Sequence, residues 1–315
     1  MSDSPNPVDS FWRTMSLPLP RSVQEGSRLA IVAPSGPFDV ESFRAGVDWL
    51  KQRYEITHSS GIFSQEGYLA GSDAQRLRDL QGAIQDPTVD AILCARGGFG
   101  ATRLLPQLEL NEIAAANKLI VGFSDITALH SLWAKAGVRS LHAPMVAALG
   151  KSSEGIRGRW IEALEHPELP FTWELEAFES AGNGAVEGRL IGGNLAVLGA
   201  LNGTPYAPPL DGAILFFEDV GERPYRIDRM LTTLSQAGWF DRIGGLILGA
   251  FTEGDPGPDG VSIEEVMLRQ FEGASFPVLT GFPAGHIDEN MPLPLGATAR
   301  IVGNRLLVHE QSGSS

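Results

Sequence analysis

Two neighbouring stretches decide the expected fold: "VDAILCARGG" (residues 89–98) and "NKLIVGFSDITALHSLWAKAG" (residues 117–137). Each opens on a short apolar run typical of a buried strand, and the run ends in glycine and polar residues that favour a turn. In the second stretch, helical spacing starts directly after the turn, at "DITALH" (125–130). A buried strand that leads through a tight turn into a helix is the repeating unit of a parallel α/β sheet.

The same alternation precedes these stretches. Strands are expected at "RLAIVAPSG" (28–36) and "YEITHSS" (54–60), and helices at "FDVESFRAGVDWLKQ" (38–52) and "SDAQRLRDLQGAIQD" (72–86). The last opens on a Ser-Asp pair that is typical of a helix start. The sequence therefore predicts an N-terminal parallel-sheet α/β domain over 26–150, preceded by a flexible Ser- and Pro-rich segment over 1–25.

The composition changes at 151–185, where "KSSEG", "EHPELP" and "ESAGNG" are loop-like and suggest a linker. Beyond it the pattern is less regular. It still contains apolar strands, helical spacing and a terminal hairpin that turns at Gly303-Asn304. We expect a smaller C-terminal α/β domain with mixed β structure over 186–310, so the expected fold class is α/β with two domains.

Charge and cysteine content exclude several classes of function. The 315 residues include 24 Lys and Arg against 38 Asp and Glu, a net charge of −14, which would repel nucleic acid and anionic membranes. No apolar run reaches the ~18 residues that a membrane helix needs. The single cysteine, Cys94, rules out an internal disulfide and cysteine-rich zinc sites, and we expect it to be buried. The N-terminus lacks a secretory pattern, so a cytoplasmic protein is expected.

Ser124, at the turn of "GFSD", has two interpretations. Ser and Asp before a helix commonly cap it, because their oxygens accept orphan backbone N–H bonds, and the local pattern alone favours this role. The alternative is a nucleophile on a strand–turn–helix, with helix N–H groups aimed at a developing oxyanion. The GxSxG elbow is absent because Ile126 replaces its second glycine, which disfavours an ordinary α/β-hydrolase.

A serine nucleophile needs a base, and the base needs an acid to orient it. Among six histidines, His286 is the best candidate because it stands in a polar loop with no local pattern that calls for an imidazole. His142, at the end of a predicted strand, is second. For the acid, "GAILFFEDVGE" (212–222) ends in three carboxylates, and spacing does not choose among them. They are Glu218, Asp219 and Glu222.

The glycines of "RGGFG" (96–100) follow a predicted strand and could form a nest of N–H groups for an anion. "GFGATR" (98–103) lacks the third glycine of a dinucleotide fingerprint, so a Rossmann site is weakly supported. An oxyanion site needs only close approach of the backbone and fits better. No nucleotide or other cofactor is therefore expected.

Four blocks in order carry a family resemblance. They are "ARGGFGATRLLP" (95–106), "GFSDITALH" (122–130), "GGNLAVLGALNGTPY" with "LFFEDVGERPYRIDRML" (192–231), and "GHIDENMPLPLGATARI" (285–301). Together they resemble the LD-carboxypeptidase family of serine peptidases, which also contains the microcin C self-immunity hydrolases. The resemblance covers about residues 27–307.

The resemblance implies a triad in which Ser124 is the nucleophile, His286 the base and Glu218 the group that orients it. It also implies an oxyanion hole made by the backbone amides of Gly98 and Asp125. Enzymes of this family need no metal, are usually cytoplasmic homodimers, and release the terminal D-alanine from a murein tetrapeptide during cell-wall recycling.

The blocks look closer to the recycling peptidases than to the immunity branch, but a hydrolase of microcin-like aminoacyl nucleotides stays open, as does a peptide-binding protein without catalysis. A carboxypeptidase must also recognise a free carboxylate, for which arginine is suited. Candidate substrate-binding residues, chosen by position only, are Arg96, Gly97, Arg226 and Arg229.

Overall fold

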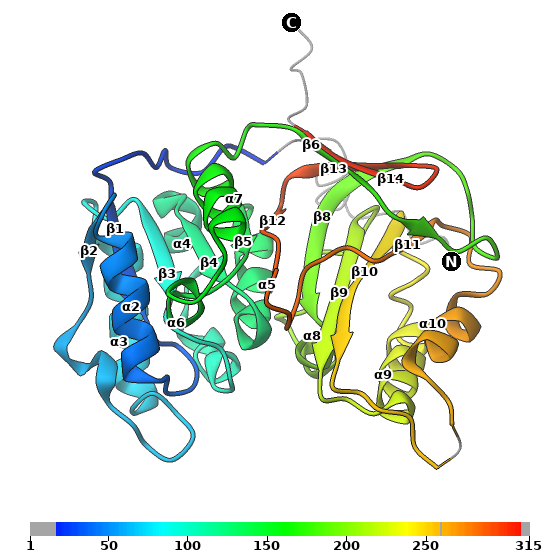
Figure 1. Ribbon diagram of the computed structural model, residues 1–315, viewed down its shortest axis with the longest axis horizontal. Coiled ribbons are helices and arrows are strands. Elements are labelled where there is room, and N and C mark those ends of the chain that lie inside the picture. The colour runs from blue at the N-terminus through cyan, green and yellow to red at the C-terminus, as the bar shows by residue number, and fades with distance from the viewer. Residues whose placement is uncertain (1–16, 259, 310–315) are drawn as a thin grey trace, which may run out of the picture.

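The computed structural model describes residues 17–258 and 260–309. Of the segment expected to be flexible, residues 1–16 lie outside the described residues. Residues 17–25 contain no helix or strand, and they bury Leu17 and Val23. Two sheets lie side by side and form the centres of two lobes (Figure 1).

The first sheet has six strands in the order β12-β5-β4-β3-β1-β2. Five are parallel, which confirms the parallel sheet expected from the sequence, and β12 pairs antiparallel with β5 at one edge. The strands are β1 (Arg28–Val32), β2 (Glu55–Thr57), β3 (Ala91–Cys94), β4 (Leu119–Gly122), β5 (Ser140–His142) and β12 (Leu293–Leu295).

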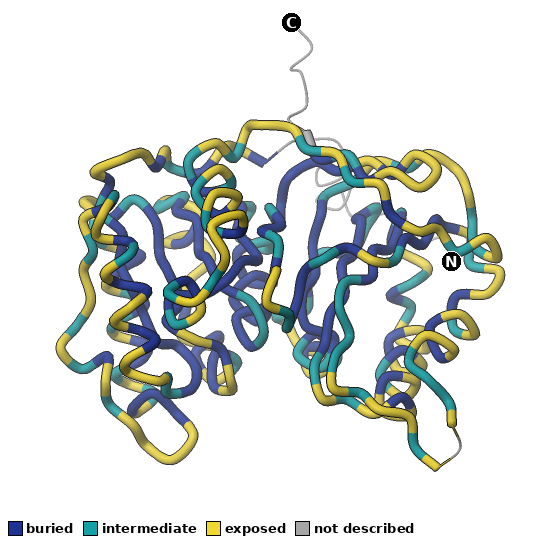
Figure 2. Tube along the Cα trace, viewed as in Figure 1, coloured by how far each residue is buried: buried dark blue, intermediate teal, exposed yellow. Residues whose placement is uncertain are grey.

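Helices cover both faces of this sheet, and the apolar strands are buried between them (Figure 2). One face packs on α2 (Val40–Leu50), α6 (Val146–Leu149) and α7 (Glu154–Glu165). The other packs on α3 (Asp73–Gln85), α4 (Leu110–Ala116) and α5 (Thr127–Ala136). Short 3₁₀ turns complete this half: η1 (Ser60–Phe63), η2 (Ala101–Arg103), η3 (Leu105–Gln107) and η4 (Ser124–Ile126). Cys94 is fully buried, as expected.

The second sheet has eight strands in the order β6-β14-β13-β8-β9-β10-β11-β7. Four consecutive strands, from β8 to β11, are parallel and the others pair antiparallel, which confirms the mixed β structure expected here. The strands are β6 (Phe171–Glu174), β7 (Glu176–Ala177), β8 (Val186–Asn194), β9 (Ile214–Val220), β10 (Gly245–Thr252), β11 (Val278–Thr280), β13 (Thr298–Val302) and β14 (Arg305–His309).

Three helices cover one face of the second sheet, and a returning segment of chain covers the other. The helices are α8 (Leu195–Leu201), α9 (Pro224–Gln236) and α10 (Ile263–Phe271). On the opposite face, apolar side chains of residues 282–297 pack against the strands. Because this segment ends in β12, the chain crosses from the second sheet back into the first. Within the described ranges, no helix is long and apolar enough to cross a membrane.

Residues 151–185 were expected to be loop-like, but they contain α7, β6 and β7. The helix starts at Ser153, whose hydroxyl accepts a hydrogen bond from Ile156 N, and it buries Ile156, Trp160 and Leu164 on one face. The strands β6 and β7 add to the second sheet at its two ends. Turn residues thus hid a helix with regular apolar spacing. The division into 26–150, 151–185 and 186–310 stays a prediction.

We predict that stability depends on pH through His130 in α5. Its buried Nε2–H donates to the Gly122 carbonyl (2.9 Å), and burial, followed by the nearby His142, lowers the pKa of His130 from 6.5 to about 3. As the pH falls through 6.5, His130 therefore takes up a proton in the unfolded chain but stays neutral in the folded chain. The contribution of His130 to the free energy of unfolding is complete above pH 6.5. It falls as the pH drops toward 3, by at most about 1.4 kcal/mol per pH unit.

Urea unfolding at several pH values tests this prediction. His130→Gln should flatten the fall in unfolding free energy between about pH 6 and pH 4 by up to about 1.4 kcal/mol per unit. The control is His58→Gln, because the His58 side chain is exposed in the folded protein. Equal slopes in wild type and His130→Gln would show that His130 does not cause the acid sensitivity.

Candidate functional site

The candidate residues lie where parallel strands end. In the first sheet, β1 lies between β2 and β3. The chain runs from β1 to one side, toward β2, and from β3 to the other side, toward β4. A crevice forms at the strand ends where the strand order reverses in this way. The loops after β1, β3 and β4 meet there. They carry Ser35 and Gly36, the "RGGFG" segment (96–100), and Ser124.

Ser124 does not cap a helix, which corrects the local interpretation of its sequence. It is the first residue of η4 and has φ of +63°, a conformation that L-residues other than Asn and Asp rarely adopt. Neither η4 nor α5 has a side-chain cap. Strain of this kind persists only where surrounding structure imposes it, and it is concentrated at functional sites.

The Asp125 carboxylate fixes this turn to the neighbouring loops. One oxygen, Oδ2, accepts hydrogen bonds from Ser35 Oγ (2.6 Å) and Ala101 N (2.8 Å). The side chain is buried, and burial raises the pKa of Asp125 despite these two bonds. From sequence we expected the backbone N–H of Asp125 to matter more than its carboxylate, so these two hydrogen bonds give the carboxylate a structural role that spacing did not reveal.

Gly97 brings the "RGGFG" loop against Ser124. A Cβ at Gly97 would lie 2.9 Å from Ser124 Cβ and 3.1 Å from Ser124 Oγ. The Gly97 carbonyl accepts a hydrogen bond from Gly36 N (3.0 Å). In a trans peptide the C=O and the following N–H point in opposite directions, so the Gly98 N–H points away from Gly36. The peptide that carries the expected oxyanion donor is therefore held in one orientation.

The second sheet supplies an imidazole and a carboxylate that are hydrogen-bonded. His286 Nδ1 donates to Glu218 Oε2 across 2.7 Å. Glu218, in β9, is completely buried, whereas the imidazole is 21% exposed. Burial would raise the pKa of Glu218, but His142 and His286 together hold it below its ordinary value. The carboxylate is thus kept ionised next to a partly accessible imidazole.

The other two carboxylates of "FFEDVGE" have different partners. Asp219 accepts hydrogen bonds from Asn194 Nδ2 (3.0 Å) and from the backbone of Ala196 (2.8 Å), so it holds the start of α8. Burial raises the pKa of Asp219 to about 6. Glu222 lies 3.5 Å from Arg226 in an exposed i,i+4 pair. Of the three acids that the sequence left open, Glu218 is the one bonded to an imidazole.

Phe123 connects the two lobes at this point. Its ring meets the His286 imidazole edge-on, with centroids 4.9 Å apart, and Ser124 is the next residue in the chain. The loop around His286 is fixed by Gly285, whose N–H donates to Asn290 Oδ1 (3.0 Å). Gly285 has φ of +130°, and a Cβ there would lie 2.9 Å from Glu218 Oε2. His286 is thus bonded to Glu218 on one side and packs on the other against Phe123, the residue before Ser124.

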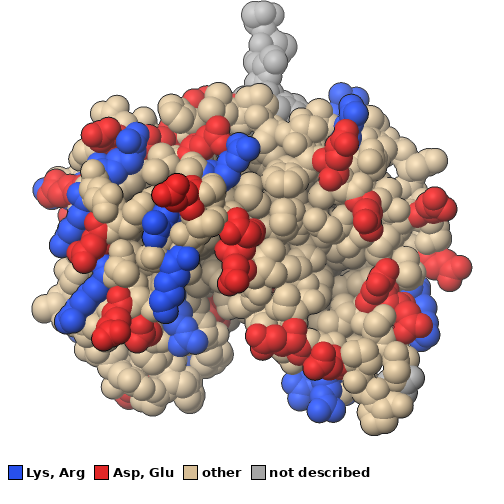
Figure 3. Space-filling model, in the orientation of Figure 1, with Lys and Arg blue, Asp and Glu red and all other residues tan. Residues whose placement is uncertain are grey.

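A hollow lies beside this group. It has a volume of about 500 Å³ and is lined by Phe123, Pro144, Lys151 and residues 287–290. The space-filling view shows that the molecule is also hollowed between its lobes along the edge toward which β9 and β10 run (Figure 3). The strand ends that carry the candidate residues thus face open space between the lobes.

The arginines chosen by position have partners of their own. Arg96 is exposed, and its Nη1 donates to the Pro37 carbonyl (2.6 Å). Arg226 Nε contacts Tyr225 Oη at 3.3 Å, and Arg229 lies over the Tyr225 ring at 5.4 Å. All three stay predictions as carboxylate-binding residues. Lys151, which lines the hollow, is a cation that sequence reasoning missed.

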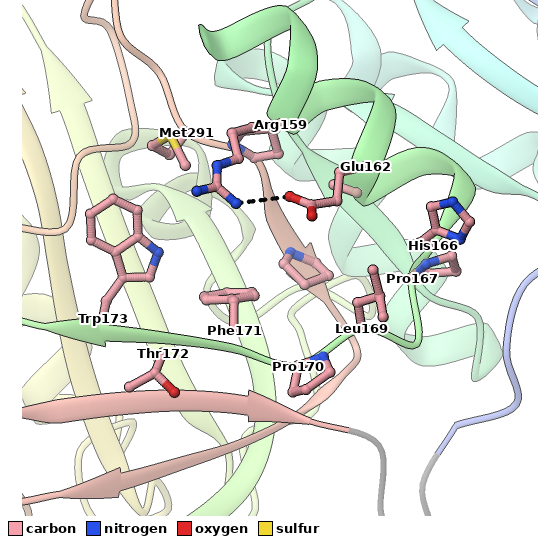
Figure 4. Close-up of a pocket in the computed structure, with 13 residues that line it drawn as sticks. Arg159, Glu162, His166, Pro167, Leu169, Pro170, Phe171, Thr172, Trp173 and Met291 are labelled. Atoms are coloured by element: carbon pink, nitrogen blue, oxygen red, sulfur yellow. Dashed lines mark hydrogen bonds and ion pairs between the residues drawn. The ribbon is translucent and has the colours of Figure 1, made fainter.

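A second hollow, of about 380 Å³, lies between α7, β6 and β12, away from the candidate site (Figure 4). Apolar rings and prolines line most of it, and an ion pair between Arg159 and Glu162 (2.9 Å) crosses one side. It holds no serine, and its one histidine, His166, pairs with Glu168 in an exposed contact. It therefore lacks the combination of serine, imidazole and buried carboxylate found at the candidate site.

We predict that the Asp125 carboxylate stabilises the crevice as a hydrogen-bond acceptor. Asp125→Ala leaves Ser35 Oγ and Ala101 N without their buried acceptor, which should lower the unfolding free energy by about 1–3 kcal/mol per group. Asp125→Asn can place its carbonyl oxygen where Oδ2 accepts both bonds, so it should stay within about 1 kcal/mol of wild type. Urea denaturation measures both. An alanine variant as stable as the asparagine variant would contradict the prediction.

Comparison with known proteins adds a family to this geometry. Residues 29–143 match the family model of the LD-carboxypeptidase N-terminal domain, and residues 187–301 match that of the C-terminal domain. The crystal structure of muramoyltetrapeptide carboxypeptidase from Oxalobacter formigenes superimposes with a TM-score of 0.82. The two chains are 31% identical, and the match covers 90% of this chain and 99% of that one.

Two sequence relatives extend the comparison. The murein tetrapeptide carboxypeptidase of Pseudomonas aeruginosa is 33% identical, over 89% of this chain and 94% of its own length. The microcin C7 self-immunity protein of Escherichia coli is 28% identical, over 88% of this chain and 90% of its own length. Both domain models and nearly full-length relatives therefore agree. The chain belongs to the LD-carboxypeptidase family and is a serine-type carboxypeptidase.

Proposed function

We propose that the protein is an LD-carboxypeptidase that releases the terminal D-alanine from a murein tetrapeptide through a Ser124–His286–Glu218 triad. The observation that carries this proposal is the 2.7 Å bond from His286 Nδ1 to the buried Glu218, with the same imidazole packed on Phe123, next to Ser124. Because Nδ1 keeps its proton and donates it in the hydrogen bond to Glu218, Nε2 is left as the basic nitrogen.

The proposed reaction has two steps. Ser124 Oγ attacks the scissile carbonyl and gives its proton to His286 Nε2, which passes the proton to the departing amine of D-alanine. An ester between Ser124 and the shortened peptide remains. His286 then takes a proton from water, the hydroxide attacks the ester, and the proton returns to Ser124. The backbone N–H groups of Gly98 and Asp125 stabilise the oxyanion in both steps.

The substrate is proposed to lie between the lobes, since the nucleophile comes from the first sheet and the acid and base from the second. The hollow beside Phe123 offers it space, and Arg96, Gly97 and Arg226 are the proposed contacts to its backbone and free carboxylate. A role in murein recycling, a cytoplasmic location and a homodimeric state belong to the same proposal. The murein substrates in the names of two relatives support the first of these.

A second candidate substrate is a microcin-like aminoacyl nucleotide. Two exposed aromatic side chains favour it: Tyr68 and Phe99 are 66% and 48% exposed, with ring centroids 5.8 Å apart. Phe99 follows the Gly97–Gly98 peptide in the loop that touches Ser124, and aromatic rings in such a position are suited to stacking on a base. The match to the immunity protein of Escherichia coli covers 88% of this chain.

We predict that the purified protein releases D-alanine from murein tetrapeptide and that Ser124→Ala abolishes this release. Parallel incubations with the tetrapeptide and with an aminoacyl sulfamoyl adenylate, analysed by mass spectrometry, identify the substrate. His286→Ala and Glu218→Ala should lower kcat by several orders of magnitude, because the serine loses its base or the base its orientation. Full activity of Ser124→Ala would overturn the triad. Binding of the tetrapeptide without turnover by wild type would favour a peptide-binding protein.

A second prediction concerns the close contact at Gly97. The φ of Gly97 is not in the left-handed region, so the backbone can accommodate an alanine there. The new Cβ must nevertheless displace Ser124. A shift of about 1 Å in the nucleophile should lower kcat/KM by roughly ten- to a hundred-fold. The matched control is Gly82→Ala in α3, where an added Cβ meets nothing within 4 Å. Wild-type kcat/KM in Gly97→Ala would show that the loop does not position Ser124.

A further inference from the structure

The two oxygens of Glu218 have different surroundings. Oε2 accepts the hydrogen bond from His286, whereas Oε1 has no hydrogen-bond partner among the described residues. Oε1 faces His142 Nε2 at 3.9 Å, and both side chains are completely buried. Neither ring nitrogen of His142 has a hydrogen-bond partner in the part of the chain that the structure describes. A buried carboxylate oxygen and a buried imidazole thus face each other with their polar atoms otherwise unused.

Such an arrangement is costly unless the two groups serve each other. A buried polar atom without a partner costs about 1–3 kcal/mol, and a buried charge costs more. A neutral imidazole always carries one N–H, and an ionised carboxylate accepts at both oxygens. The separation exceeds a direct hydrogen bond by about 1 Å, a distance that small side-chain rotations can close.

We propose that His142 is a positioning residue whose Nε2–H donates to Glu218 Oε1, so that the carboxylate is held between two imidazoles. This inference rests on the proposed triad and deepens it. Glu218 then engages one oxygen with each ring, and its orientation toward His286 is fixed from behind. His286 keeps the tautomer in which Nε2 is free to take the Ser124 proton.

The position of His142 in the fold suits this role. It ends β5, and its register partners are Gly122 at the end of β4 and Leu293 in β12. The rings of Phe123 and Phe216 pack against it, with centroids 5.7 and 5.1 Å from that of the His142 ring. The first sheet therefore presents both the nucleophile turn and, from the adjacent strand, the proposed second donor to an acid of the second sheet.

Few other titratable groups face this pair. Glu218 is faced by His286 and His142, with Asp219 as its neighbour in β9. His142 is faced by Glu218 and by His130, whose ring centroid is 6.4 Å away. His130 stays neutral at the pH of activity, because burial and then His142 lower its pKa to about 3. A change in the titration of the acid–base pair on altering His142 is thus attributable to the contact with Glu218.

The sign of the pH effect follows from charge. The active pair of Glu218 and neutral His286 carries −1, and it carries zero after taking a proton. A donor on Oε1 stabilises the −1 form more than the neutral form. Losing that donor makes proton uptake easier, so the acid limb of the kcat/KM profile should move to higher pH, on the order of one unit.

His142→Met and His142→Gln test the proposal, with kcat, KM and the pH profile measured for D-alanine release. Methionine is similar in length and adapts to apolar sites, but it has no N–H. We expect His142→Met to lower kcat at least about ten-fold with KM nearly unchanged and to shift the acid limb upward. Glutamine places an amide N–H near the ring Nε2 and should restore most of kcat and the wild-type limb. His130→Gln, the matched control, should leave the limb unchanged.

The outcomes separate this proposal from the triad itself. A wild-type acid limb and kcat in His142→Met, while Ser124→Ala remains inactive, would overturn the role of His142 and leave the triad intact. Activity in Ser124→Ala would overturn the triad instead. If His142→Met does not fold, ¹⁵N NMR of the histidines in wild type decides: an His142 ring protonated at Nε2 supports the proposal, and one protonated only at Nδ1 overturns it.

Discussion

The antiparallel pairing of β12 with β5 is the constraint on which the site depends. Leu293, Pro294 and Leu295 come from late in the chain, yet they complete the edge of the first sheet opposite His142, Leu141 and Ser140. The chain reaches that edge directly from β11 of the second sheet, and His286 lies on the crossing. This pairing helps to fix the proposed base, His286, relative to the proposed nucleophile, Ser124, in the first lobe. The apolar side chains of the crossing segment also cover one face of the second sheet, so the segment that carries His286 is part of the core of the second lobe.

Close backbone contacts turn this crossing into a defined geometry. At Gly97 and Gly285 a side chain would occupy the space of Ser124 and Glu218, respectively. Each contact brings a loop against a residue far away in sequence, so these loops must be held by something other than their own secondary structure. Two side-chain acceptors do this: Asp125 binds Ser35 and Ala101 in one lobe, and Asn290 binds Gly285 in the other. Each acceptor is buried, which makes its hydrogen bonds costly to break and the loop positions correspondingly well determined.

The sequence predicted what depends on local patterns. A helix with regular apolar spacing and a Ser-Asp start was expected at 72–86, where α3 lies with Ser72 as its N-cap. The strand β8 was missed, because Gly188 and Gly192 allow neighbouring backbone to approach where apolar side chains would normally mark a buried strand. β12 was missed as well, since its three residues pair only with a strand some 150 residues earlier in the chain. The local pattern around Ser124 favoured a cap, and it could not reveal the left-handed φ that tertiary contacts impose on this residue. His286 was selected first among the six histidines, and the family resemblance selected Glu218. Only folding brings His286 Nδ1 within 2.7 Å of Glu218 Oε2.

The two adjacent acids of β9 show how one strand separates structure from chemistry. Successive side chains of a strand point to opposite faces, so Glu218 and Asp219 cannot share an environment. Glu218 faces the imidazoles of His142 and His286, which hold its pKa low in spite of complete burial. Asp219 faces the start of α8, where burial outweighs the hydrogen bonds from Val220, Ala196 and Asn194, and its pKa rises to about 6. An acid that must orient a base at neutral pH has to stay charged, whereas an acid that only anchors a helix can tolerate a pKa near the working range. The alternation of side chains along β9 thus places Glu218, the proposed orienting acid, beside His286 and places Asp219 at the start of α8.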